Sequence, residues 1–162
     1  MHKEFNIRLI QPGDNPQIES IIKDVMTEYG AVGKGYSIED DEVRNMYEAY
    51  CNESSVYFVI EDGDTILGGA GIGPLIGGDP EICELKKMYF RPELRGLVYG
   101  KLLMELCLDS AKQLGYSKCY LETLGRMPQA KGLYQKYGFV PLDTPLGKTG
   151  HFNCENWYIR DL

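Results

Sequence analysis

The spacing of apolar residues along the chain predicts short strands separated by amphipathic helices. Residues 5–9 alternate apolar and polar side chains, which is typical of a half-buried strand. Over residues 18–25 the apolar positions recur at intervals of three and four, and this spacing places them on one face of a helix. We expect this helix to end near Tyr29 and Gly30, where a glycine-bearing loop begins.

A second helix and a hairpin follow this loop. Ser37 and the acidic residues after it are expected to open the helix, whose inner side would carry Val43, Met46, Tyr47 and Tyr50. Residues 55–60 and 65–73 then read as two strands joined by an Asp-Gly-Asp turn. Four glycines fall in the second strand, at positions 68, 69, 71 and 73. Because glycine weakens a strand, we expect another group to pack closely against it.

The second half of the chain predicts a strand, a helix, a strand, a helix and two final strands. In chain order these are residues 81–90, 99–114, 117–123, 128–137, 139–142 and 155–159. Residues 81–123 form a strand–helix–strand crossover within an order of β-α-α-β-β-β-α-β-α-β-β. This order predicts an α/β (α+β) protein with a mixed sheet and helices on both faces. No linker or repeat divides the chain, so we expect a single domain over residues 1–162.

Composition and charge narrow the classes of function. The 162 residues carry a formal net charge of −7, which argues against nonspecific binding to nucleic acid. An acidic balance is compatible with a cationic amine substrate, although it also serves solubility alone. No apolar run is long enough to cross a membrane, and the polar N-terminus leads directly into a strand pattern. We therefore expect a cytoplasmic protein with no membrane partner.

The cysteines and histidines do not suggest a metal site or a disulfide framework. The number of cysteines is five, and none of them forms a C-x-x-C pair. Three of them, Cys83, Cys107 and Cys119, lie in apolar periodic segments and are interpreted as buried thiols. Neither His2 nor His151 has a partner at ligand spacing, so we expect no metal.

The segment with the clearest chemical signal is a turn that leads from the strand at residues 81–90 into the following helix. Arg95, Gly96 and Gly100 belong to this turn, which leaves unpaired N–H groups at the helix N-terminus. Together with the helix dipole these groups favour a phosphate, and Arg95 and Lys101 can add positive charge. Glycines before a helix can also serve the turn alone. The sequence matches neither G-x-x-x-x-G-K-[ST] nor G-x-G-x-x-G.

Two motifs in this half of the chain resemble those of the GNAT (Gcn5-related) N-acetyltransferases. The pattern Arg95-Gly96-x-x-x-Gly100, after a strand ending Lys87-Met88-Tyr89-Phe90-Arg91-Pro92, resembles the family's acetyl-CoA motif. The segment Ala130-Lys131-Gly132-Leu133-Tyr134-Gln135-Lys136-Tyr137-Gly138-Phe139 resembles its second motif, and the element order is the family's throughout the chain.

The resemblance implies a mostly antiparallel sheet of six to seven strands with a central β-bulge that splays two strands apart. The sequence departs from the family's motifs at Val98, where a glycine is usual, and at Met127, where an asparagine is frequent.

The resemblance also implies how acetyl-CoA is bound. The main-chain N–H groups of residues 97–101 would hold the pyrophosphate, and the strand end at residues 88–90 would pair with the pantetheine arm. The full set implied to bind the cofactor is Met88, Tyr89, Phe90, Arg95, Gly96, Leu97, Val98, Tyr99, Gly100 and Lys101. The alternative is that the strand residues only belong to the core.

Acetyl transfer to an amine requires a base for the amine, polarisation of the thioester carbonyl and protonation of the departing thiolate. Tyr134 aligns with the tyrosine that the family places near the sulfur, and the alternative is a packed helix tyrosine. Glu84 is the candidate base, with a pKa that an apolar strand would raise, unless it is an edge carboxylate paired with Lys86. Glu122 is its rival, and the N–H of Met88 is a candidate oxyanion donor. A cysteine nucleophile is not required.

The acceptor pocket is the least defined part of the prediction. In the family it lies between the loop after the first helix and the C-terminal hairpin. These segments contain Tyr29, Tyr36, Asp40, Asp41, His151, Asn153 and Trp157. Aromatic rings with carboxylates suit a cation, although the same residues could simply close the end of the sheet.

The resulting prediction is an N-acetyltransferase that acetylates a primary amine of a small molecule or peptide. One alternative is a GNAT-fold sensor that binds acyl-CoA without catalysis, and another is a plain nucleotide-binding α/β protein. By analogy with the family we expect a homodimer.

Overall fold

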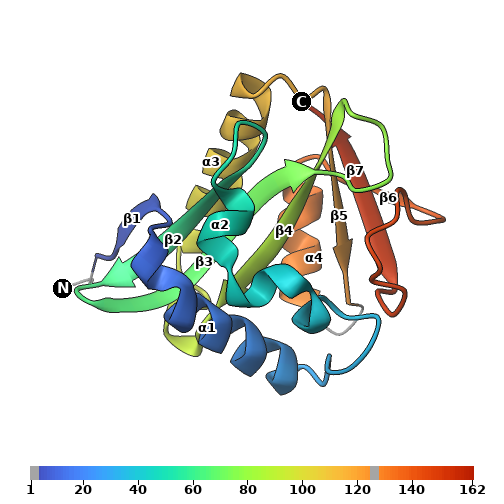
Figure 1. The fold of residues 1–162 in the computed structure, drawn as a ribbon. Coiled ribbons are helices and arrows are strands. Elements are labelled where there is room, and N and C mark those ends of the chain that lie inside the picture. Colours follow the sequence, from blue (N-terminus) through green and yellow to red (C-terminus); the bar gives the residue numbers. More distant parts are fainter. Residues whose placement is uncertain (1–3, 125–127) are drawn as a thin grey trace.

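The computed structural model describes residues 4–124 and 128–162, which form one twisted sheet covered by helices (Figure 1). The sheet has seven strands in the order β1-β2-β3-β4-β5-β7-β6. The strands are β1 (Asn6–Leu9), β2 (Val56–Asp62), β3 (Thr65–Pro74), β4 (Ile82–Phe90), β5 (Lys118–Thr123), β6 (Val140–Leu142) and β7 (Asn156–Asp161). The helices are α1 (Asn15–Glu28), α2 (Met46–Tyr50), α3 (Tyr99–Gln113) and α4 (Pro128–Lys136).

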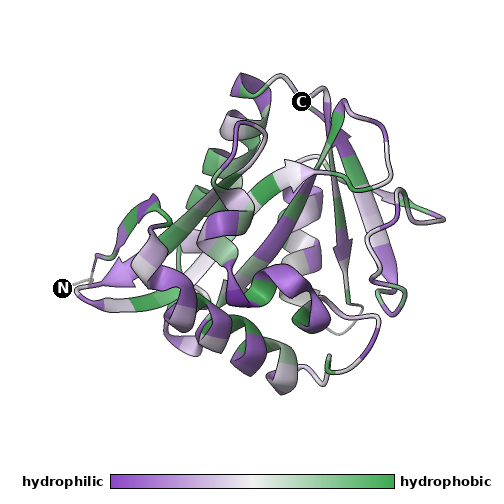
Figure 2. Ribbon diagram, in the orientation of Figure 1, coloured by the Kyte–Doolittle hydropathy of each residue, from purple (hydrophilic) through white to green (hydrophobic). Residues whose placement is uncertain are grey.

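Helices α1 and α2 lie on one face of the sheet, and α3 and α4 lie on the other (Figure 1). Hydrophilic and hydrophobic residues alternate along α1 and α3, as amphipathic helices require (Figure 2). Ile18, Ile21 and Ile22 of α1 pack into one core, and Leu103 and Met104 of α3 pack into the other. The predicted α/β class, with helices on both faces of a mixed sheet, is therefore confirmed.

Strands β4 and β5 form the parallel pair of an otherwise antiparallel sheet. Their pairing covers Ile82–Glu84 opposite Lys118–Tyr120 and ends there, although β4 continues to Phe90 and β5 continues to Thr123. The two strands therefore separate in the middle of the sheet. This splay, which the family resemblance implied, provides the space for the candidate site.

A β-bulge in β4 lies next to the splay. Gly69 of β3 pairs with Tyr89 and Gly71 pairs with Lys86, so that two residues of β4 oppose Ala70. One of these two residues, Lys87, has a φ of 55°, a left-handed conformation that side chains rarely adopt. The predicted central bulge is present, and its strained residue is a buried lysine.

Two of the four glycines of β3, Gly69 and Gly71, are explained by the ring of Tyr57, which lies against this strand. A Cβ atom added at Gly69 or Gly71 would come within 2.6 Å of that ring. The Tyr57 hydroxyl then donates a hydrogen bond of 2.7 Å to the carbonyl oxygen of Lys87 in the bulge. The expected close packing against the glycine-rich strand is confirmed, and it links β2 to the bulge of β4.

The predicted second helix is largely replaced by tighter turns, so this prediction was wrong in its extent. Residues Ser37–Glu39 and Asp41–Arg44 form 3₁₀ turns, and α2 spans five residues, Met46–Tyr50. Asp40 separates the two turns with an extended backbone (φ −63°, ψ 137°). Its carboxylate is bonded to Lys87 and His151, and these long-range contacts hold it out of a helix.

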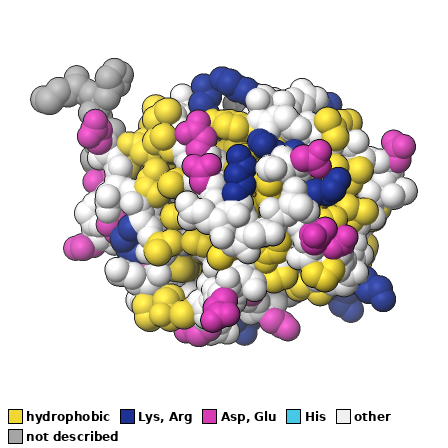
Figure 3. All heavy atoms as spheres, turned by 90° about the horizontal axis from the view of Figure 1, so that it is seen from above, with side chains coloured by type: hydrophobic (Ala, Val, Ile, Leu, Met, Phe, Trp, Pro, Cys, Tyr) yellow, Lys and Arg dark blue, Asp and Glu magenta, His cyan; other side chains and the backbone are white. Residues whose placement is uncertain are grey.

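All five cysteines are free, and Cys83, Cys107 and Cys119 are buried, as the sequence predicted. On the face shown in Figure 3, acidic and basic side chains are interspersed with hydrophobic ones. None of the helices within the described residues has the length and apolar character needed to cross a membrane.

Candidate functional site: two joined cavities beside the splayed strands

The larger of the two cavities is an open groove of about 730 Å³ along the end of β4 and the start of α3. Its lining includes most of the residues predicted to bind the cofactor: Met88, Tyr89, Phe90, Arg95, Gly96, Leu97, Gly100 and Lys101. Val98 and Tyr99 are not part of this lining. The ring of Tyr99 is buried, and its hydroxyl accepts a hydrogen bond of 2.7 Å from the N–H of Phe5, so only its main chain could serve a ligand.

The turn before α3 has the geometry of an anion-binding helix N-terminus. Gly96 has a φ of 76°, and the helix begins at Tyr99 without a side-chain cap. The first N–H groups of a helix have no acceptor within it, so residues 99–101 can offer theirs to a ligand. The N–H of Leu97 already donates to the carbonyl of Leu94 at 3.3 Å. Val98 has an ordinary φ of −72° and an exposed side chain, so a glycine is not required there.

The cations around this groove have different surroundings. Arg95 is tied to the protein by an ion pair with Glu28, by hydrogen bonds of 3.1 and 3.3 Å to the carbonyl of Phe90, and by the ring of Tyr29. Lys101 and Lys136 both line the groove, and Lys101 lowers the pKa of Lys136. Two lysines that repel one another favour an anion between them. Lys136 belongs to the second motif but was not predicted to bind the cofactor.

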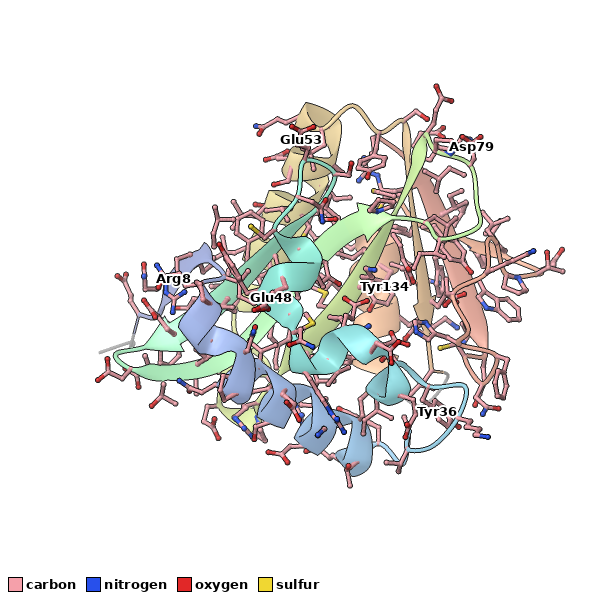
Figure 4. All side chains as sticks on the ribbon, in the orientation of Figure 1. Arg8, Tyr36, Glu48, Glu53, Asp79 and Tyr134 are labelled. Atoms are coloured by element: carbon pink, nitrogen blue, oxygen red, sulfur yellow. The ribbon has the colours of Figure 1, made fainter. Side chains whose placement is uncertain are left out.

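The second cavity is small, about 70 Å³, and lies where β4 and β5 separate. It shares Met88, Tyr89 and Tyr134 with the groove, so the two spaces meet at these residues. Its lining also includes both predicted carboxylates, Glu84 and Glu122. The structure therefore brings the three predicted catalytic residues to one cavity. Tyr134 of α4 lies beside the middle of the sheet (Figure 4).

Glu84 is 3% exposed in the middle of the sheet, which excludes an edge position. Burial raises the pKa of its carboxyl to about 7, with Lys86 opposing the shift and Glu122 adding to it. Lys86 forms its ion pair with Glu42, at 3.3 Å, and not with Glu84. Glu84 is thus a carboxyl that takes up and releases a proton near neutrality.

Glu122 has a different environment although it lines the same cavity. One oxygen accepts hydrogen bonds from Thr149 at 2.6 Å and His151 at 3.0 Å, and the other accepts one from Tyr120 at 2.7 Å. Burial raises the pKa of Glu122, but these hydrogen bonds outweigh it and hold the pKa below its usual value. Glu122 is therefore ionised and fully engaged, which makes it a poorer base than Glu84.

Tyr134 lies in α4 and Tyr137 directly follows this helix, but the two side chains have different environments. Tyr134 is buried against Phe139 and Tyr158, and burial raises the pKa of its hydroxyl, which also bonds Thr123. Tyr137 instead donates to Glu105 at 2.8 Å, away from the cavities. Tyr134 consequently stays protonated at neutral pH, as an acid must, and borders both cavities.

Charged side chains from distant segments surround the small cavity. Lys87, whose side chain is fully buried, pairs with Asp40 at 2.5 Å, and Asp40 also contacts His151 at 2.8 Å. Asp40 and His151 were among the predicted acceptor residues, whereas Lys87 was predicted only as part of the strand end. The signal for it was a lysine inside an otherwise apolar central strand.

Other acceptor candidates lie elsewhere. Tyr29 lines the large groove, and Asn153 donates to the carbonyl of Lys34 at 2.8 Å. Tyr36 lies on the loop after α1, near the edge of the molecule (Figure 4). The carboxylates of Asp40 and Glu122 are already matched by Lys87 and His151, so the expected acidic site for a cation is internally neutralised.

The sequence places no partner at ligand spacing from His151, whereas folding brings two possible ligands, Glu122 and Cys154, close to its ring. Its ring lies with Glu122 and Cys154 such that one ligand atom from each falls within 4.8 Å of the others. However, Nδ1 is already 3.0 Å from Glu122, and burial raises the pKa of the Cys154 thiol to about 12. A metal would have to displace the proton on Nδ1 of His151 and the proton of the Cys154 thiol.

Comparisons with known proteins agree with the motifs. The model of the acetyltransferase (GNAT) family matches residues 18–139. The chain is 40% identical over 150 residues to the uncharacterized N-acetyltransferase YjgM of Escherichia coli, which covers 92% of this chain and 90% of the relative. An uncharacterized N-acetyltransferase of Schizosaccharomyces pombe is 33% identical over 129 residues, covering 79% of this chain and 77% of its own.

Two solved structures share the fold over almost their full length. A GNAT acetyltransferase from Staphylococcus aureus superposes with a TM-score of 0.81 at 21% identity, covering 98% of this chain and 99% of the other. The PaiA N-acetyltransferase of Thermoplasma acidophilum, solved in complex with coenzyme A, gives a TM-score of 0.72 at 18% identity, with 99% and 100% covered.

Proposed function

Because the chain belongs to the acetyltransferase (GNAT) family, we propose that it transfers an acetyl group from acetyl-CoA to a primary amine of a small molecule or peptide. The observation that carries this proposal is the junction of the two cavities. A groove bordered by a helix N-terminus meets a buried pocket that holds Glu84, and Tyr134 stands at the boundary.

The groove suits the phosphates and the pantetheine arm of coenzyme A. The N–H groups of residues 99–101, together with Lys101 and Lys136, would receive the phosphates. The strand end at Met88 and Phe90, where β4 leaves β5, would pair with the pantetheine arm through its main chain. The coenzyme A complex of the Thermoplasma relative supports acyl-CoA as the donor.

The chemistry follows from the protonation states of the two catalytic residues. Glu84, ionised above about pH 7, removes a proton from the ammonium, directly or through water. The free amine attacks the thioester carbonyl, and the N–H of Met88 stabilises the developing oxyanion. The C–S bond breaks as the attacking nitrogen loses its second proton to water and the amide forms. Tyr134 gives its proton to the departing thiolate and is then reprotonated from water. No covalent enzyme intermediate is needed.

A second candidate is a protein that binds acyl-CoA without turning it over. The observation that favours it is the size of the inner cavity, which at about 70 Å³ admits only the end of an amine. Of the two departures from the family motif, Val98 is accommodated by ordinary backbone geometry, and Met127 lies outside the described residues.

The test measures thiol release from acetyl-CoA across polyamines, amino acids, aminoglycosides and peptide N-termini. Wild type is compared with Glu84→Gln and Tyr134→Phe, and acetyl-CoA binding is measured by calorimetry. Turnover of an amine that falls in both variants, with binding preserved, supports the transferase. Binding without turnover on any amine supports the second candidate, and absence of binding contradicts both.

A further inference from the structure

His151 is enclosed between two carboxylates. Its Nδ1 lies 3.0 Å from Oε1 of Glu122, and its Nε2 lies 2.9 and 2.8 Å from the two carboxylate oxygens of Asp40. An ionised carboxylate only accepts hydrogen bonds, whereas a neutral imidazole carries one N–H and one acceptor nitrogen. Both contacts are satisfied together only when both ring nitrogens carry a proton. With both carboxylates ionised, the geometry therefore favours an imidazolium.

This imidazolium joins segments that are far apart in the sequence. Asp40 lies between the two 3₁₀ turns after α1, Glu122 lies on β5, and His151 belongs to the loop between β6 and β7. Asp40 also accepts a hydrogen bond from Lys87, the strained and buried residue of the β4 bulge. Through these contacts His151 connects the loops on the acceptor side to the two strands that splay apart.

We propose that His151 is a positioning residue whose imidazolium bridge closes the acceptor side of the inner cavity and reserves the role of base for Glu84. This inference rests on the proposed acetyltransferase function. Glu84 and Glu122 line the same cavity from neighbouring strands, and two such carboxyls compete for one proton. His151 removes this competition, because Glu122 stays ionised while it is hydrogen-bonded to the imidazolium.

The charged and titratable groups that face His151 come from several elements. They are Asp40 from the loop, Glu122 from β5, Glu84 and Lys87 from β4, and Cys154 from its own loop. Burial lowers the pKa of His151, but the hydrogen bonds to Asp40 and Glu122 outweigh it and raise the pKa to about 9. The bridge is therefore present at neutral pH and is lost as the pH rises through about 9.

The direct test is nitrogen-15 NMR of the histidine rings in the intact protein. The chain has two histidines, His2 and His151, so the spectrum contains two imidazoles, and His151→Gln assigns them. We expect both nitrogens of His151 to stay protonated at neutral pH, and Asp40→Asn or Glu122→Gln to lower its pKa by about one unit or more. A neutral ring at neutral pH, or titration near the ordinary value of about 6.5, overturns the proposal.

The same spectra distinguish a proton from a metal between His151 and Glu122. Equimolar Zn²⁺ should leave the Nδ1 signal unchanged, and a metal-bound shift at Nδ1 would overturn the bridge. These measurements do not need turnover. Their failure is therefore distinguishable from failure of the proposed function, which thiol release and acetyl-CoA calorimetry report.

Kinetics then test the positioning role. His151→Gln should raise KM for the best amine by about tenfold or more through misplacement of the acceptor wall, with acetyl-CoA affinity unchanged. Thr149→Val is the matched control, because it removes a neutral donor from the same oxygen of Glu122 without removing charge, and it should have a smaller effect. In His151→Gln the acidic limb of the pH profile should also shift, since Glu122 becomes free to titrate. Kinetics and a pH profile equal to those of wild type overturn the role.

Discussion

The two joined cavities are lined by different kinds of groups. The large groove is bordered by main-chain groups at a turn and a helix N-terminus, with two lysines near its rim. The small cavity is bordered by charged side chains from β4, β5 and the loop before β7, and most of them are paired with one another or with Asp40. Main-chain binding depends on backbone conformation, whereas the small cavity depends on the identity of each side chain. We therefore expect substitutions to affect the two cavities by different mechanisms.

The largest expected effect is on the side-chain cavity. Glu84→Gln should lower kcat/KM for an acceptor amine by about 100-fold or more, because the base is lost. Acetyl-CoA affinity should not change. In the wild type, kcat/KM should rise with pH up to about 7, where Glu84 becomes ionised, and this limb should vanish in the variant. An unchanged acidic limb in Glu84→Gln would assign the base to another group.

The same substitution should stabilise the fold. The pKa of Glu84 is raised to about 7, chiefly by burial, so between about pH 4.5 and 7 the unfolded chain releases a proton that the native state keeps. Stability contributed by the protonated carboxyl is therefore lost as the pH rises through this window. Glu84→Gln avoids the loss and should raise the free energy of unfolding by about 1–3 kcal/mol above neutrality. Urea unfolding at several pH values tests this, and a gain that does not shrink toward acidic pH would contradict it.

The scaffold under the small cavity should tolerate little added volume. Gly71→Ala would place a methyl group 2.5 Å from the carbonyl oxygen of Val56 and 2.6 Å from the ring of Tyr57, and we expect a loss of about 1–3 kcal/mol. Gly132→Ala in α4 is the control. Its added methyl meets nothing within 4 Å, and it should stabilise by about 0.5–1 kcal/mol. Thermal unfolding of both variants tests this prediction. An unchanged free energy of unfolding in Gly71→Ala would contradict the close packing.

The groove should depend on backbone geometry at Gly96. Gly96→Ala forces an alanine to a φ of 76° and should lower the free energy of unfolding by about 1–2 kcal/mol. If the turn relaxes instead, acetyl-CoA affinity should fall, by about five- to thirtyfold for that energy. Val98→Gly should leave the affinity unchanged, because Val98 already has a φ of −72°. Calorimetry with acetyl-CoA measures both variants, and tighter binding by Val98→Gly would show that the valine obstructs the groove.

The smallest effect is expected at the rim of the groove. Lys136→Ala should weaken acetyl-CoA binding by about two- to threefold at low salt, because an exposed charge is screened by water and ions. The difference from wild type should disappear at high salt. Lys118→Ala is a matched control that should not change binding, because Lys118 lies at the start of β5, outside the lining of the groove, and pairs with Asp161. A difference that persists at high salt would indicate a buried contact instead.

Much of the fold followed from local patterns. The strands, the amphipathic helices α1 and α3 and the turn before α3 were predicted because apolar periodicity, glycine and proline act over a few residues. The region around Asp40 did not follow, since its acidic residues suggested one helix. Contacts with Lys87 and His151, which lie 47 and 111 residues away in the sequence, keep it extended.

The candidate site divides in the same way. The family and the glycine-bearing turn before α3 could be predicted from the sequence, because both rest on short motifs. Tyr134 was proposed as the acid from the second of these motifs, and Glu84 and Glu122 were proposed as bases from their places on central strands. The sequence did not separate Glu84 from Glu122, since both are glutamates on central strands. The difference between them arises in the tertiary structure. Glu84 is buried and has no ion pair with Lys86, whereas Glu122 receives three hydrogen bonds. A carboxyl's pKa depends on what surrounds it in space, and those neighbours are brought together only by folding.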